Sequence, residues 1–278
     1  MYDYTLDPEG DVILTLRNPN APFAVWNKDT AENSENPDPP LANEPPPGPV
    51  TFRVSSRHLI LASPVFKAAL TGPWKEGIKA QNGCLEIEAE DWDVDALLIA
   101  MNVIHCRLNR VPLALGLEDL SKVAGLVDYY QLHDAFYLHK LHWIPALKEN
   151  LPKLYNRELM LWISIAWVFN DDDIFTDTTH VAIQHHTGYL QPLELPIPST
   201  VIDRIVEKRN VTIAALVGAL HELIQAFLDE SEGCSFECRS ILLGALQKQL
   251  HNPKPHLHKT RAAMNGLKLS DFTQSKSE

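Results

Sequence analysis

The stretch FRVSSRHLILASPVFKAAL, Phe52–Leu70, constrains the fold more than any other segment. Ser63 can cap a helix and Pro64 suits a first helical position, so we expect two short helices to meet there and the second to end at Gly72. The residues just before, VTFRVSS, have the β-branched pattern of a strand. A strand that leads directly into two helices is therefore predicted.

Strand patterns occur only in the first half of the chain. DVILTL is expected to form a hairpin with the short apolar run PFAVW, and CLEIEAED alternates as a further strand. Asp91 or Asp93 is expected to cap the helix that follows. Helical spacing of apolar residues marks three longer segments: Val94, Leu97, Leu98, Met101 and Ile104; Leu117, Leu120, Val123, Ala124 and Val127; and Ile213, Leu216, Val217, Leu220, Leu223, Ile224 and Phe227.

These patterns predict an α+β fold in which an all-α region follows a mixed half. We expect a tail at 1–10, a mixed domain at 11–150, a helical domain at 151–252 and a flexible tail at 253–278. Residues 27–49 are rich in Pro, Asn and Glu with little to bury, which predicts a disordered insert within the mixed domain.

Charge and cysteine content narrow the function. The net charge of −12 and the absence of Lys/Arg runs are unfavourable for binding nucleic acid directly or an anionic membrane. The acidic N-terminus lacks the pattern of a secretory signal, and the longest apolar run, 159–169, is too short to cross a bilayer. Four sparse cysteines without disulfide spacing fit a reducing compartment, so we expect the cytoplasm or nucleus.

Serine, histidine and arginine side by side in the opening stretch raise the question of catalysis. Ser55, Ser56 and His58 contain a nucleophile and a base, but a dyad needs an acid that holds the base. Asp11 is the candidate acid, and the sequence does not show whether it approaches. The chain also lacks GxGxxG, Walker and GxSxG motifs. The simpler interpretation is that the serines satisfy helix N–H groups, so we expect no enzyme and no cofactor.

Two cysteines are the candidate metal ligands. Cys234 and Cys238 are four residues apart, and His251, His256 and His258 follow, a spacing that resembles Cys₂His₂ zinc sites. The alternative is that these cysteines are small buried hydrophobic residues. HELIQ, His221–Gln225, lacks the second histidine of a zinc-protease helix. The expectation is no metal.

The ordered segments GDVILTL, FRVSSRHLILASPVFKAAL, WKEG, CLEIEAEDWDVDALLIAMNVIH and LEDLSKVAGLVDYYQL resemble a BTB/POZ domain of the type common in filamentous fungi. The resemblance covers residues 11–150. It implies a three-stranded sheet surrounded by helices, and it makes five residues the fold-defining positions: Asp11, Phe52, Leu59, Ser63 and Phe66. Ser55 and Ser56 stand where many members of the family carry a basic pair.

The family implies protein–protein interaction, including self-association and docking to the cullin scaffold of a ubiquitin ligase. The hydrophobe-x-acid element of cullin-binding members is matched by Leu117, Glu118 and Asp119. We therefore expect a non-enzymatic adaptor or scaffold whose partners are proteins, without direct contact to nucleic acid or membrane. A transcriptional or pathway regulator that acts through protein contacts, without binding DNA, is the alternative.

Overall fold

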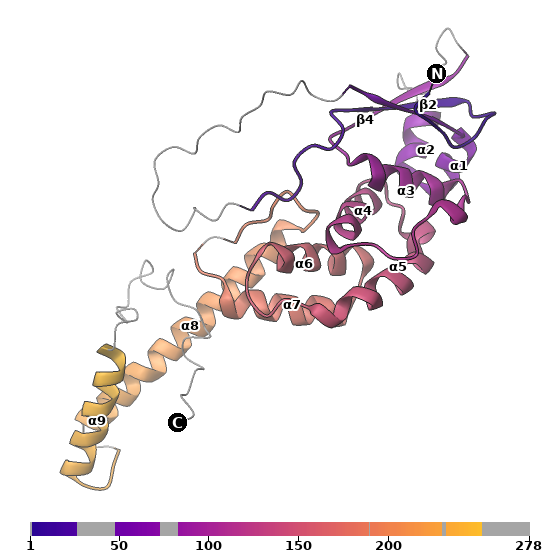
Figure 1. The fold of residues 1–278 in the computed structure, drawn as a ribbon. Coiled ribbons are helices and arrows are strands. Elements are labelled where there is room, and N and C mark those ends of the chain that lie inside the picture. The colour runs from indigo at the N-terminus through magenta and orange to yellow at the C-terminus, as the bar shows by residue number, and fades with distance from the viewer. Residues whose placement is uncertain (1, 27–47, 73–82, 189, 230–231, 252–278) are drawn as a thin grey trace. The chain divides into compact units, whose positions relative to one another are not determined.

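A computed structural model describes residues 2–26, 48–72, 83–188, 190–229 and 232–251. The chain is a mixed α/β protein with one small sheet and mostly helices (Figure 1). It divides into two compact units. Unit 1 comprises residues 1–152, 156–178 and 192–197, and unit 2 comprises 153–155, 179–191 and 198–278. Unit 1 thus extends past the boundary expected at 150. The insert expected at 27–49 lies outside the described residues except for 48 and 49, and the expected tail at 253–278 lies wholly outside them.

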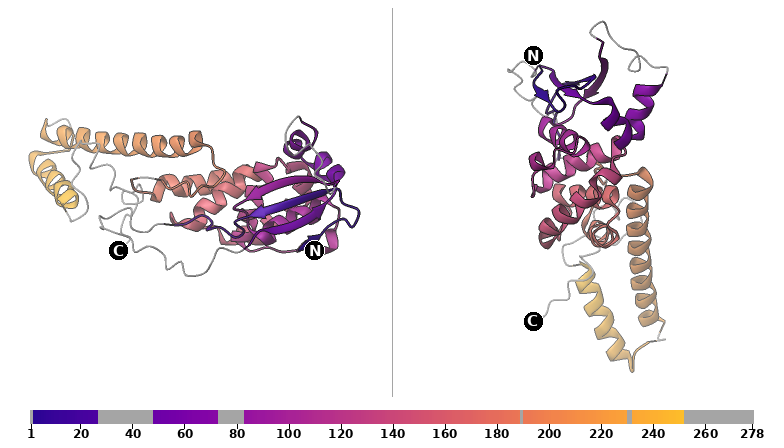
Figure 2. Two further views of the ribbon diagram at one scale, coloured as in Figure 1. Left: turned by 90° about the horizontal axis from the view of Figure 1, so that it is seen from above. Right: turned by 90° about the vertical axis from the view of Figure 1, so that its right-hand side faces the viewer.

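The sheet of unit 1 has the strand order β1-β3-β2-β4. Its strands are β1 (Tyr4–Thr5), β2 (Val12–Arg17), β3 (Val50–Val54) and β4 (Leu85–Glu90). β2 runs antiparallel to β3 and parallel to β4, whereas β1 runs parallel to β3. Buried and exposed residues alternate along β4, and helices cover one face of the sheet (Figure 2). The alternation places one apolar face against the helices.

Two expectations about the sheet are wrong. Among the described residues the sheet has four strands rather than three, because residues within the expected N-terminal tail form β1. The expected hairpin is absent from the described residues: β2 lies between β3 and β4, and 22–26 contribute no strand. Gly10 allows the chain before β2 to pass close to the end of β3, since a Cβ at that position would lie 2.6 Å from the carbonyl oxygen of Val54.

Six α-helices lie wholly within the described part of unit 1. Their bounds are α1 (Ser56–Ala62), α2 (Pro64–Thr71), α3 (Val94–Ile104), α4 (Leu117–Tyr129), α5 (His133–Leu147) and α6 (Arg157–Phe169), with short 3₁₀ turns at Leu108–Arg110 and Lys148–Asn150. The Ser63 side chain accepts a hydrogen bond from the N–H of Phe66, which confirms the predicted cap, and Gly72 follows α2 as expected. Asp93, not Asp91, caps α3.

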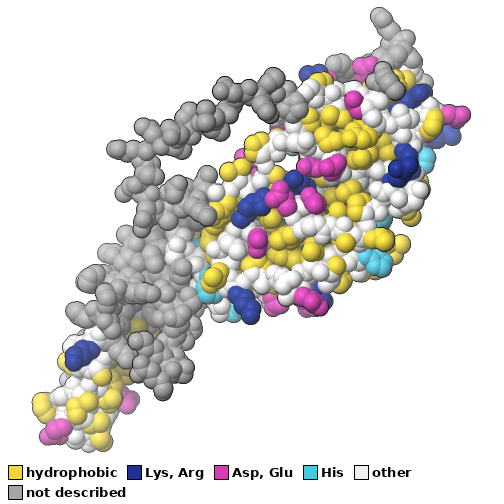
Figure 3. Space-filling model, viewed as in Figure 1, with side chains coloured by type: hydrophobic (Ala, Val, Ile, Leu, Met, Phe, Trp, Pro, Cys, Tyr) yellow, Lys and Arg dark blue, Asp and Glu magenta, His cyan; other side chains and the backbone are white. Residues whose placement is uncertain are grey.

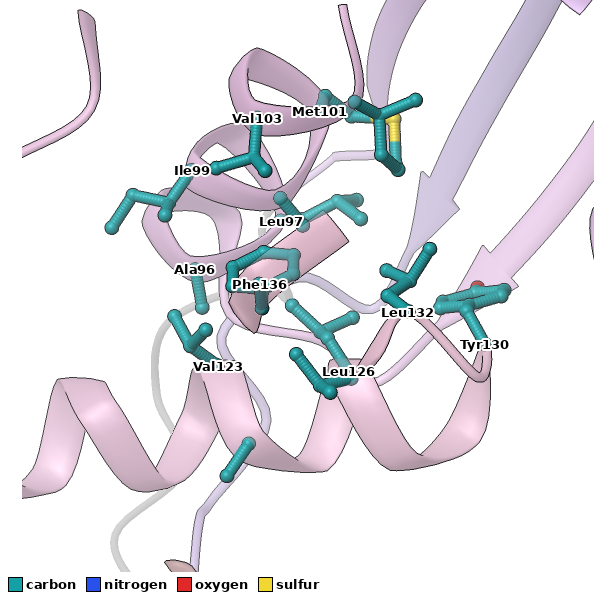
Figure 4. Packing of buried hydrophobic residues seen from close by; sticks show 14 of the residues in the cluster. Ala96, Leu97, Ile99, Met101, Val103, Val123, Leu126, Tyr130, Leu132 and Phe136 are labelled. Atoms are coloured by element: carbon teal, nitrogen blue, oxygen red, sulfur yellow. The ribbon is translucent and has the colours of Figure 1, made fainter. Parts of the chain in front are cut away.

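The core of unit 1 lies between the sheet and these helices. Leu97 of α3 and Val123 and Leu126 of α4 lie around Phe136 of α5, and Met101 of α3 lies nearer the strands (Figure 4). Each of these five side chains is fully buried. The helical spacing seen in the sequence therefore marks the faces that are packed together.

Two long helices, α8 (Ser199–Leu228) and α9 (Phe236–His251), pack against each other in unit 2. α7 (Asp172–His185) begins in unit 1 and ends in unit 2. α8 is the single described helix that is long and apolar enough to span a membrane, with a mean hydropathy of 1.7 over its most apolar stretch and 11% of that stretch buried. Length and composition alone are the basis of that finding. Of the predicted apolar stripe in α8, only Ile213 and Val217 are buried.

Candidate functional site

Asp11, which the sequence left unplaced, lies against the first turn of α1. Its Oδ1 accepts from the backbone N–H of Ser56 and its Oδ2 from the Ser56 hydroxyl, both at 2.8 Å. The residue just before β2 thus supplies the cap that Ser55 does not, because the Ser55 side chain makes no cap hydrogen bond. A carboxylate at a helix N-terminus also complements the helix dipole.

His105, at the end of α3, completes this polar cluster. Its Nε2 accepts from the backbone N–H of Ser55 at 3.0 Å, so the imidazole proton resides on Nδ1, which donates to the Met101 carbonyl at 2.8 Å. The ring stacks on His58 with centroids 5.0 Å apart. Burial lowers the pKa of His105, and the charges of His58 and Arg107 add to that lowering, whereas the hydrogen bond to Met101 and the charge of Asp7 oppose it. His105 is therefore a neutral, fully hydrogen-bonded ring.

The hydrogen bonds of Asp11, Ser56 and His105 support the start of α1. The Ser56 hydroxyl donates to a carboxylate, and both ring nitrogens of His105 are engaged by the backbone. A serine nucleophile needs a free imidazole nitrogen within hydrogen-bond reach of its oxygen. What the cluster does is fasten the start of α1 to β2 and to the end of α3.

The other positions singled out from the resemblance lie in the same region. The side chains of Phe52, Leu59 and Phe66 are buried in the core. Ser63 is also buried, and besides capping α2 it donates from its hydroxyl to the carbonyl of Tyr130 at 2.6 Å. Its backbone N–H donates to the Leu59 carbonyl at the C-terminal end of α1. Ser63 thereby joins α1, α2 and the end of α4.

The hydrophobe-x-acid element forms the first turn of α4 rather than a loop. Leu117 is half-buried against the core, and Glu118 forms ion pairs with Arg157 at 2.8 Å and Lys122 at 3.3 Å. Burial raises the pKa of Glu118, but the hydrogen bonds from Arg157 and Lys122 outweigh it and lower the pKa overall. Both acids of this element are exposed, and only Glu118 forms ion pairs within the described residues.

Cys234 is exposed and Cys238 half-buried, and both are free thiols. Hydrogen bonding to the Cys234 backbone and thiol lowers the pKa of the Cys238 thiol. No group of three or more possible metal ligands occurs within the described ranges, and His256 and His258 lie outside them. Two thiols alone do not provide the four ligands of structural zinc.

His105 was missed by sequence reasoning, because a histidine at a helix end carries no local signal of a partner fifty residues away.

The burial of His105 leads to a prediction about the pH dependence of stability. The pKa of His105 is lower in the folded state than in the unfolded chain, so the unfolded state binds more protons as the pH falls below about 6.5. The contribution of the neutral His105 ring to stability is therefore present above that pH and is lost on acidification.

We expect the thermal unfolding midpoint to decrease between pH 7.5 and 5.5, and to decrease less in His105→Gln. The half-buried His139 and the buried His186 also have lowered pKa values, so part of the slope remains. His133→Gln, at an exposed position, is the matched control. Calorimetry at several pH values measures the slope, and identical slopes for His105→Gln and the native chain would contradict the assignment.

Comparison with models of known protein families found no match, and comparison with curated proteins found none either. The class that the structure defines is a mixed α/β protein with a small four-stranded sheet and mostly helices. Function must therefore be argued from the surfaces of this chain.

Proposed function

We propose that the chain is a non-enzymatic interaction module of BTB/POZ type that works as an adaptor or scaffold. The observation that carries this proposal is the outer face of α5. Tyr137 is 56% exposed, Leu138 67% and Leu141 51%, while Phe136, Trp143 and Ile144 of the same helix are buried. A helix that is apolar on both sides is normally covered on both sides.

We call Tyr137, Leu138 and Leu141 the α5 face. Apolar side chains gather on the surface over α5 (Figure 3). Lys140 lies beside them, with its ammonium 5.4 Å from the Tyr137 ring centroid and donating to the Phe169 carbonyl at 2.7 Å. This lysine holds α5 to the end of α6 and fixes one side of the Tyr137 ring. A contiguous apolar patch with an ordered aromatic residue is typical of a protein-binding surface.

The expected test result is loss of partner binding when this face is charged. In Leu138→Asp with Leu141→Asp we expect at least a tenfold weaker interaction, because charges in the centre of an interface are strongly unfavourable. Both side chains are more than half exposed, so the unfolding midpoint should remain within a few degrees of the native value. Leu113→Asp, at a 93% exposed leucine outside the face, is the matched control.

The measurement has two parts. Sedimentation of the purified chain tests whether the α5 face binds a second copy, and purification of the tagged chain from cells, followed by titration of the identified partner, tests heterologous binding. Equal binding by the native, charged and control chains would rule out the α5 face as the interaction surface.

A cullin scaffold is the narrower version of the proposal, and Asp119 is the residue we propose to contact it. This version of the proposal rests on Leu117, Glu118 and Asp119. Asp119 faces solvent, whereas Glu118 already forms ion pairs within the chain. Failure of any cullin to copurify at low salt would contradict this version and leave the adaptor role to other partners. The net charge of −12 supports action through protein contacts rather than through DNA.

A further inference from the structure

A groove in unit 1 lies beside the edge strand β4, away from the polar cluster at α1. Its volume is about 280 Å³. The lining combines the aromatic residues Trp92, Tyr129 and Tyr130 with the charged residues Arg17, Glu88 and Glu90. Sites for drug-sized ligands and cofactors range from roughly 300 to 1,000 Å³, so this groove suits a single side chain better than a cofactor.

The three rings form walls at large angles to one another. Trp92 and Tyr129 meet edge to face with centroids 5.5 Å apart and an interplanar angle of 64°, and Tyr129 and Tyr130 do so at 4.8 Å and 82°. Rings so arranged cannot stack flat against each other. All three residues line the groove, so an ammonium group bound there can lie against an aromatic ring.

The groove is built on rigid supports. Tyr130 stacks on Phe66 at 4.4 Å, and its carbonyl accepts from Ser63. Its place at the end of α4, beside Leu132, is visible in Figure 4. The Trp92 carbonyl accepts from Asn20, and a Cβ at Gly125 would lie 3.5 Å from the Trp92 ring. Fixed walls reduce the entropy lost when a ligand binds.

The charge of the groove selects a cation. Glu88 and Glu90 are two residues apart on β4 and so lie on the same face of the strand. Arg17 pairs with Glu88 at 2.6 Å, but both side chains are more than half exposed and such a pair contributes little. Glu90 has no ion-pair partner within the described part of the chain. One uncompensated carboxylate therefore remains beside three aromatic rings.

We propose that this groove binds the ammonium group of a lysine side chain on a partner peptide, with methylated lysine preferred. Methylation lowers the cost of removing the ammonium from water while keeping its attraction to the rings. A peptide is the source we infer, because β4 is at the edge of the sheet and an extended segment can lie along it. This surface is distinct from the α5 face, so the inference goes beyond the proposed function. Failure of either proposal would leave the other unaffected.

The test is calorimetric titration of the full chain with glycine-flanked peptides whose central residue is trimethyllysine, lysine or norleucine. We expect affinity to decrease in that order and to decrease with added salt, since norleucine lacks the charge. Trp92→Ala and Tyr129→Ala should each weaken trimethyllysine binding about fivefold or more. Tyr129 is 61% exposed, so its variant keeps the test valid if Trp92→Ala does not fold.

Two charge variants should change the affinity in opposite directions. Glu90→Gln should weaken binding, whereas Arg17→Gln should strengthen it, because the arginine competes for Glu88. The doubly charged α5 variant should bind the peptide as the native chain does. Equal affinity for the norleucine peptide, no binding of the trimethyllysine peptide, or unchanged binding in both ring variants would overturn the proposal. Tetramethylammonium that binds as tightly as the peptide would overturn the assignment to a peptide.

Discussion

Replacing Phe52 with alanine is expected to lower the free energy of unfolding of unit 1 by about 3 to 5 kcal/mol, the usual cost of removing a buried phenylalanine. Phe52 lies on β3, in the middle of the sheet, and is fully buried. Its ring stacks on Tyr4 of β1 with centroids 5.0 Å apart and an interplanar angle of 16°. Truncation leaves a cavity beneath the sheet and removes the ring against which β1 is placed.

The matched control makes the same chemical change at a solvent-exposed site. Phe236 is 68% exposed, so Phe236→Ala should change stability by no more than about 0.5 kcal/mol. Urea unfolding measures the total effect, and hydrogen exchange of β2 and β3 amides locates it in unit 1. Equal effects of the two substitutions would mean that Phe52 is not a core residue.

Replacing Asp11 with alanine is expected to cost about 2 to 3 kcal/mol, because two hydrogen bonds from Ser56 to a charged acceptor are lost together. The Ser56 N–H is then left without its partner at the buried start of α1. Asp11→Asn should cost less, since the amide oxygen still accepts one of the two bonds. The loss should be greatest for exchange of the α1 amides.

A double-mutant cycle separates the pair from its surroundings. If Asp11 acts through Ser56, the effects of Asp11→Ala and Ser56→Ala should be strongly non-additive, with the double variant little worse than Asp11→Ala alone. Asp95→Ala replaces an acid in the first turn of α3 and controls for the loss of one negative charge. Strict additivity of the two changes would show that the hydrogen bonds seen here do not stabilise the fold.

Local chemistry made part of this fold predictable. Ser63-Pro64 marks the junction of α1 and α2, because a cap and a proline at the first helical position act through neighbours three residues away. The spacing of Leu97, Met101 and Ile104 identified the buried face of α3. In each case the residues that decide the structure lie within one or two turns of each other.

Pairing between distant segments was not predictable in the same way. The hairpin expected after β2 is wrong because β2 pairs instead with β3 and β4, which lie tens of residues along the chain. An alternating pattern shows that a strand has a buried face, but it does not name the strand beside it. β1 was missed because two residues are too few to carry any pattern.

The sequence by itself determined the mixed first half, the helical second half, the Ser63 cap of α2 and the apolar face of α3. Only the tertiary structure decided that Asp11 caps α1, that His105 is held neutral against Ser55, and that Trp92 and Tyr129 line one groove. The physical reason is the distance along the sequence over which each interaction acts. Helix caps and apolar periodicity act over a few residues, whereas these contacts join residues separated by 37 to 50 positions and form only when the sheet and helices pack.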